Sequence, residues 1–178
     1  MPNTTQSTAT TVARWRAAAE SADASAAVAC LSPDIVLSSP LTEQFRLEGP
    51  EEVGDFLASA FTAIEDIRFH TEIGQVDSYA LAYRARVGPQ PFEEVQLLRF
   101  DDDAQISEIS LYGRPMPALT ALMITLGPKL ASQQGRRGLA ALLRATSAPV
   151  HSMVTFGDRR VVPLTRPRQR RDSRSASP

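Results

Sequence analysis

The chain has 178 residues, 43% of them hydrophobic and 22% charged, which is the size and composition of one globular domain with its own core. No apolar run approaches the ~18–20 residues of a membrane-spanning helix, so we do not expect a membrane protein. The net charge of −1 conceals an asymmetry, because residues 1–135 carry 9 basic and 18 acidic residues whereas residues 136–178 carry 10 arginines and 2 aspartates.

Several classes of chemistry find no support in the residue types present. Residues 1–11 lack the positive and apolar segments of a secretory signal, so we expect a cytoplasmic protein. Cys30 is the only cysteine, which excludes an intramolecular disulfide and a cysteine-based metal cluster, and its apolar neighbours favour a buried filler. The two histidines, His70 and His151, lack metal-binding spacing, and no Gly-rich phosphate loop is present. We therefore expect no metal and no cofactor.

The first elements are short helices followed by a strand. Val12, Trp15 and Ala19 fall at i, i+3 and i+7, which predicts an amphipathic helix. A second helix is expected over residues 24–31, ended by Ser32-Pro33 because the residue before a proline is disfavoured in the α region. A strand over residues 34–39 should follow.

Residues 49–61 predict a third helix, since Gly49-Pro50-Glu51-Glu52 places proline and two acids in its first turn. After this helix, apolar and polar residues alternate with a period of two. Four strand-like segments separated by short polar turns indicate an antiparallel meander, over residues 67–73, 78–87, 92–101 and 106–113.

The last predicted elements are helices. A helix begins near Leu119 and is expected to be interrupted at Gly127-Pro128, and Leu139, Leu142 and Leu143 suggest one further short helix. We place the domain at residues 1–148 and expect residues 149–178 to form a largely disordered Arg/Ser/Pro-rich tail.

The element order, together with the segments LSPDIVLSSP (31–40), FRLEG (45–49) and LLRFDDDAQISEI (97–109), resembles the nuclear transport factor 2-like superfamily and most closely its SnoaL-like bacterial members. The resemblance covers roughly residues 8–130. It implies an α+β fold in which a curved, mixed or antiparallel sheet wraps as a cone around the N-terminal helices, with extra C-terminal helices and a pocket for an apolar ligand inside. Independently, a meander with one apolar face must bury that face against amphipathic helices.

The resemblance also implies where catalytic groups would lie. Ketosteroid isomerases of this superfamily carry a carboxylate base at the position that matches Ser39, and their oxyanion-binding residues match Gln96 and Trp15. Epoxide hydrolases of the superfamily place an acid at Gln96 as well. A serine without an activating partner is too weak a base, so both mechanisms are disfavoured and the catalytic residues stay unknown. An isomerase, cyclase or hydrolase reaction on a small apolar substrate stays open.

Six side chains are our candidates for the pocket: Trp15, Ser39, Tyr83, Glu94, Gln96 and Tyr112. Strand alternation places Gln96 on one face with Glu94, and a neutral amide on an apolar face must find a partner. If the protein is an enzyme, we expect a raised pKa for Glu94 inside the cone. Each candidate also has a structural interpretation: a core anchor for Trp15, a strand-end residue for Ser39, and sheet packing with a solvated hydroxyl for the two tyrosines.

Two functions follow as hypotheses. The first is a small-molecule-binding domain with a pocket for an apolar ligand, acting as an enzyme or as a carrier. The alternative is a non-catalytic module that forms a homodimer or docks a partner through the outer sheet face of Val95, Leu97 and Arg99. Nucleic acid is not the expected partner of the arginine-rich tail, because no lysine or aromatic residue is interleaved with its arginines.

Overall fold

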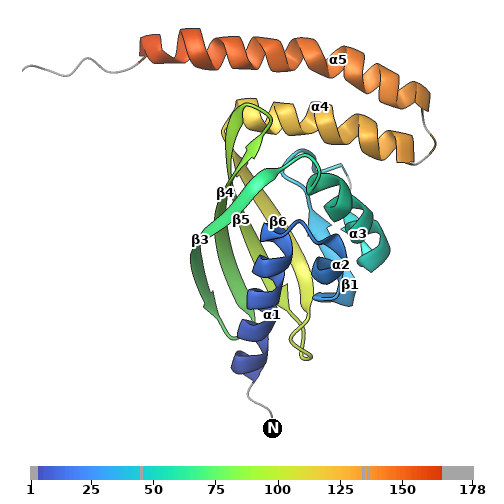
Figure 1. Ribbon diagram of the computed structural model, residues 1–178, viewed down its shortest axis with the longest axis vertical. Helices are drawn as coiled ribbons and strands as arrows, with labels where there is room; N and C mark the ends of the chain where they lie inside the picture. The colour runs from blue at the N-terminus through green and yellow to red at the C-terminus, as the bar shows by residue number, and fades with distance from the viewer. Residues whose placement is uncertain (1–3, 45, 134, 136, 166–178) are drawn as a thin grey trace, which may run out of the picture.

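The structure, a computed structural model, describes residues 4–44, 46–133, 135 and 137–165. A curved six-stranded sheet lies against three N-terminal helices, and two longer helices pack together at one end of the molecule (Figure 1). The α+β class is thus confirmed. The elements are α1 (Thr4–Glu20), α2 (Ala24–Val28), β1 (Leu31–Ser38), β2 (Leu47–Glu48), α3 (Gly49–Ala60), β3 (Glu65–Gln75), β4 (Ser78–Val87), β5 (Gln90–Phe100), β6 (Ile106–Arg114), α4 (Met116–Gln133) and α5 (Arg137–Phe156).

The sheet has the strand order β2-β1-β6-β5-β4-β3. Strands β3 to β6 form the expected antiparallel meander, and β1 joins it by pairing in parallel with β6. The sheet is therefore mixed. It curves around α1 and α3, so that its inward-facing side chains meet the apolar faces of these helices (Figure 1).

The start of α3 follows the sequence closely. Gly49 adopts a φ of +79°, a left-handed conformation that glycine reaches without strain, and Pro50 occupies the first turn with Glu51 and Glu52. Val53, Phe56 and Leu57 of this helix are buried, and Phe61, the residue after it, is partly buried.

The boundary between α2 and β1 differs from the prediction. Helix α2 ends at Val28, and β1 begins at Leu31 because Leu31 pairs with Ile106 of β6. Pro33 lies inside β1, where the register with β6 shifts between Leu31 and Val36. An irregularity of this kind is where a strand tolerates a residue without a backbone N–H.

The core fills the space between the sheet and the helices. Val12, Trp15 and Ala19 of α1 are buried as expected, and so is Cys30. On β5 the inward positions include Phe92, Leu98 and two polar residues described below. The cone interior is thus apolar with a small polar region on β5.

Two expectations for the C-terminal part are wrong. Helix α4 is not interrupted at Gly127-Pro128, since it continues to Gln133 with Pro128 inside it, and Leu126 and Ala131 on either side of the proline are buried. Residues 149–165 are helical rather than disordered: α5 runs to Phe156 and short helical turns continue to Thr165.

The packing of α5 on α4 accounts for this helical structure. Ala140 and Ser147 are buried, and His151 Nδ1 lies 2.9 Å from the Thr120 hydroxyl of α4. Residue 148, where we placed the end of the domain, lies within α5, and residues 166–178 of the predicted tail lie outside the described residues. None of the helices in the described parts of the chain is long and apolar enough to cross a bilayer.

Candidate functional site

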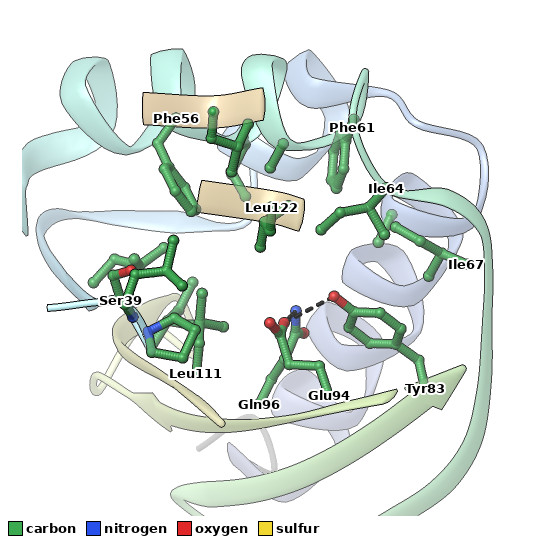
Figure 2. Close-up of a pocket in the computed structure, with 18 of the residues that line it drawn as sticks. Ser39, Phe56, Phe61, Ile64, Ile67, Tyr83, Glu94, Gln96, Leu111 and Leu122 are labelled. Carbon is green, nitrogen blue, oxygen red and sulfur yellow. Dashed lines mark hydrogen bonds between the residues drawn. The ribbon is translucent and has the colours of Figure 1, made fainter. Parts of the chain in front are cut away.

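A small cavity of about 30 Å³ lies between the sheet and helices α1, α3 and α4 (Figure 2). A water molecule needs ~10–15 Å³ of such space, so the cavity has room for roughly two waters. Most of the wall is apolar, and the polar side chains come from β4, β5 and the end of β1. The lining includes Trp15, Ser39, Phe56, Tyr83, Glu94, Gln96, Leu111, Leu122 and Leu126.

Four of these side chains form a connected polar cluster, the Glu94 cluster, which consists of Trp15, Tyr83, Glu94 and Gln96. Tyr83 is the cross-strand partner of Glu94, and its Oη donates to Glu94 Oε1 at 2.8 Å. Gln96 Nε2 donates to the same oxygen over a longer 3.4 Å, and Trp15 Nε1 donates to Gln96 Oε1 at 2.9 Å. Figure 2 shows the ends of Tyr83, Glu94 and Gln96 converging at one side of the cavity.

The Glu94 carboxyl group is buried away from compensating charge. Its side chain is 3% exposed, and none of the ion pairs among the described residues includes it. Burial raises the pKa of Glu94 to about 7, against the opposing effect of the hydrogen bonds from Tyr83 and Gln96. At neutral pH the carboxyl group is therefore divided between its acid and base forms.

The other members of the Glu94 cluster donate hydrogen bonds: Tyr83 donates to Glu94, and Gln96 links Trp15 to Glu94. Burial, together with the nearby Glu94, raises the pKa of Tyr83 well above its ordinary value, so the phenol keeps its proton and donates it. An indole nitrogen can only donate, so Trp15 selects the oxygen of the Gln96 amide and turns its nitrogen towards Glu94. The cluster can hold a carboxylate in place and accept or release one proton through it.

Ser39 lies at the wall between this cavity and the outside. Its hydroxyl accepts a hydrogen bond from the Leu41 backbone N–H at 3.2 Å, in the turn that follows β1. Ser39, Pro40, Leu41 and Leu111 line the cavity and also an open surface groove of about 1110 Å³. The segment 39–41 therefore separates the cavity from the groove.

Tyr112 is the one predicted pocket residue that the structure leaves outside the cavity. It is 59% exposed and lines the surface groove, whereas its neighbour Leu111 is buried and lines the cavity. The physical reason is the alternation of side chains along β6, which sends Ile109 and Leu111 inward and Tyr112 outward. The other five candidates line one cavity.

The sequence did not indicate which helices would cover the cavity. Phe56 of α3 and Leu122 of α4 lie on the side opposite Glu94 and Gln96 (Figure 2), and Leu126 of α4 also lines the cavity. Apolar residues at helical spacing indicate burial but do not identify the neighbour across the core. The pairing of Tyr83 with Glu94 depends on strand register, which the composition of the turn between β4 and β5 left open.

No histidine is among the described residues that line the cavity. His70 lies on the outer face, with Nε2 3.3 Å from Glu93 Oε1. Within the described residues, no three side chains of His, Cys, Asp or Glu gather closely enough to hold a metal ion.

Comparisons with known proteins now place the fold. Residues 12–109 match the family described as SnoaL-like domain. A crystal structure of a steroid delta-isomerase from Pseudomonas aeruginosa is 31% identical, with a TM-score of 0.67 over 72% of this chain and 95% of that one. No protein with a curated description matches.

Two more distant structures share the fold alone. One is a protein with a cystatin-like fold from Silicibacter pomeroyi, 20% identical, with a TM-score of 0.66 over 72% of this chain and 93% of that one. The other is a SnoaL-like protein of unknown function from Burkholderia thailandensis, 20% identical, with a TM-score of 0.54 over 64% of this chain and 100% of that one. The predicted superfamily is confirmed.

Proposed function

The chain belongs to the family of SnoaL-like domains, and from this we propose that it binds a small, largely apolar molecule inside the cone and exchanges a proton with it through Glu94. The observation that supports the proposal most strongly is the buried Glu94 carboxyl group, 3% exposed and with a pKa raised to about 7, at the edge of an otherwise apolar cavity. A general base or acid works best when its pKa lies near the ambient pH.

Each member of the Glu94 cluster has a role in this proposal. Glu94 supplies the carboxylate that Ser39 cannot supply, from β5 rather than from the end of β1. Tyr83 donates to Oε1 and holds the carboxylate, and Trp15 orients the Gln96 amide that also contacts it. Neither of these two hydrogen bonds to Glu94 uses Oε2, which leaves that oxygen for the ligand.

The reaction class we propose is a proton shift in a small unsaturated ketone. The Glu94 carboxylate removes a proton from the carbon between the carbonyl group and the double bond. The electron pair of the broken C–H bond is delocalised over the carbonyl group and the double bond as a dienolate. The protonated Glu94 then returns the proton to the far end of the dienolate, so the double bond moves into conjugation and the carboxylate is regenerated. No other reactant is needed.

The size of the cavity limits the substrate. A space of about 30 Å³ holds no ring compound unless side chains move, and the segment 39–41 is the part of the wall that faces the open groove. We propose that the ligand enters there by displacing Pro40 and Leu41. The Pseudomonas aeruginosa relative is described as a steroid isomerase, and for this chain we propose a smaller substrate.

The test uses the β,γ-unsaturated isomer of cyclohexenone as the probe. Its conversion to the conjugated isomer is followed by ultraviolet absorbance, and its binding by NMR shifts of the chain. We expect conversion by the wild type and loss of conversion, with binding retained, in Glu94→Gln. Glu93→Gln is the matched control, because Glu93 is adjacent on β5 but faces outward and pairs with Arg114. Equal conversion by Glu94→Gln would remove Glu94 from the mechanism, and absence of binding by the wild type would remove this ligand class.

A second candidate function is homodimerisation or partner docking through the outer sheet face. Leu97 is 42% exposed and Tyr112 59% exposed on that face, and Tyr112 is the cross-strand partner of Val95. A stable interface of this kind buries about 1,000 Å² or more in total. This candidate is compatible with a ligand in the cone, because the two use opposite faces of the sheet.

A further inference from the structure

Helix α5 carries a row of large apolar side chains that nothing in the described structure covers. Leu142 is 58% exposed, Met153 69% and Phe156 64%, and Leu139 and Val150 are also exposed. At about 100° per residue these five positions fall within roughly 120° of the helix circumference. We call these five residues the α5 stripe. Beyond α5 the exposed apolar residues continue with Val161, Val162 and Leu164.

The α5 stripe is separate from the side of α5 that packs on α4. Ala140 and Ser147 are buried against the rest of the protein, and His151 contacts Thr120 of α4. The helix therefore does not need to leave α4 for the stripe to meet another surface. Figure 1 shows α5 as one end of the molecule, extending past the sheet, where a flat surface can approach it.

Positive charge follows this stripe along the sequence. Arg159 and Arg160 are exposed just after α5, and residues 166–178 contain five further arginines. Residues 136–178 as a whole carry 10 arginines against 2 aspartates, in contrast to the acidic remainder of the chain. An exposed apolar helix face beside a cluster of arginines provides the two signals that stable attachment to a membrane surface requires.

We propose that α5 lies flat on an anionic lipid bilayer, with the α5 stripe in the boundary between headgroups and acyl chains and with Arg159 and Arg160 against the phosphate headgroups. A helix of 20 residues is about 30 Å long, so the whole stripe can engage one surface. This inference does not depend on the proposed chemistry in the cone.

Other occupants fit these observations less well. Pairing α5 with the α5 of a second copy would bring two arginine-rich segments into one assembly, where like charges repel. A nucleic acid would neutralise the arginines, but its phosphate backbone offers nothing to Met153 or Phe156. Of these three occupants, a bilayer surface alone is both anionic and apolar within a few ångströms of depth.

The test is co-sedimentation of the full chain with vesicles. We expect binding to vesicles of phosphatidylcholine with phosphatidylglycerol and much weaker binding to phosphatidylcholine alone. Binding should weaken in about 1 M salt, where the Debye length falls from ~8 Å to ~3 Å. The double variant Met153→Glu with Phe156→Glu should bind at least about tenfold more weakly, since both side chains would enter the acyl boundary.

The matched control is Ile73→Glu, a substitution at a position on β3 that is 68% exposed and distant in sequence from α5. It should leave vesicle binding unchanged. The fluorescence of Trp15, the only tryptophan, confirms that each variant is folded. A second variant, Arg159→Glu with Arg160→Glu, should also weaken binding and reduce its salt dependence.

Three results would overturn the proposal. The first is an absence of binding to the anionic vesicles. The second is equal binding by the Met153 and Phe156 variant, which would leave only charge attraction of the kind that nucleic acid also exerts. The third is a wild-type dimer that dissociates in that variant without any vesicle binding, which would make a second copy the occupant.

Discussion

The indole nitrogen of Trp15 on α1 donates a 2.9 Å hydrogen bond to the side-chain oxygen of Gln96 on β5, across 81 positions of sequence. The bond answers the question raised by a neutral amide on an apolar strand face, because Gln96 is satisfied by Trp15 on one side and contacts Glu94 on the other. The first helix is thereby connected to the one buried carboxyl group of the cavity.

The pH dependence of stability is the first expected consequence of the burial of Glu94. Its pKa is raised from 4.5 to about 7, so between these pH values the unfolded chain is ionised at this carboxyl group and the folded chain is not. Folding takes up a proton in this window, and the free energy of unfolding falls as the pH rises through it, by about 3 kcal/mol in total. Urea unfolding at pH 5 and pH 8 measures the difference.

Glu94→Gln removes the titrating group and should therefore remove this fall in the free energy of unfolding with pH. Glu93→Gln should keep it. Stability that rises between pH 5 and pH 8 in the wild type, or an unchanged slope in Glu94→Gln, would contradict the assignment.

Replacing Gln96 by leucine should raise the pKa of Glu94 further, because the Gln96 hydrogen bond favours the ionised form. It also leaves the buried Trp15 N–H without its partner, at a cost of about 1–3 kcal/mol in the free energy of unfolding. A carboxyl-carbon NMR titration measures the first effect and urea unfolding the second. Gln75→Leu, at the exposed end of β3, is the control and should change neither.

Replacing Tyr83 by phenylalanine should destabilise the protein more at pH 8 than at pH 5. The hydrogen bond from Tyr83 to Glu94 becomes charge-assisted when the carboxyl group is ionised, and such a bond contributes about 1.5–3 kcal/mol. Tyr79→Phe is the control on the same strand face, where the ring packs against Phe100. Equal losses at both pH values would show that Tyr83 acts by packing alone.

Much of the fold could be predicted from the sequence because its signals are local. The meander of β3 to β6 follows from alternation and polar turns, and the start of α3 from Gly49-Pro50. The errors came where tertiary packing outweighs a local signal. Pro128 predicts an interruption that α4 does not show, and α5 continues through Pro149 to Phe156, packed along α4.

The site candidates came from two sources: the family resemblance pointed to Trp15, Ser39 and Gln96, and strand alternation gave the face that Gln96 shares with Glu94. Parity placed Glu94 and Gln96 together, and the structure puts both in the cavity wall. Tyr112 was included without fixing which face of β6 points inward, and it lies outside. The hydrogen bond from Tyr83 to Glu94 depends on strand register, and the position of Leu122 in the cavity wall depends on how α4 packs. Neither is encoded by a local pattern.

The outer sheet face gives a prediction of its own. If the protein dimerises through Val95, Leu97 and their neighbours, Leu97→Glu should shift the population from dimer to monomer, because a charge would be buried without a partner. Analytical ultracentrifugation over a range of concentrations measures this shift, with Ile73→Glu as the control. A wild type that stays monomeric at high concentration would contradict the dimer.

Whether the cone holds an acid–base group that titrates near neutral pH is tested most directly by a carboxyl-carbon NMR titration of the chain labelled in glutamate, with Glu94→Gln used for assignment. We predict one glutamate with a pKa of about 7 that is missing from the spectrum of Glu94→Gln. If Glu94 instead titrates near 4.5, the ordinary value for a glutamate, the carboxyl group is solvated and the proposed proton exchange has no buried base.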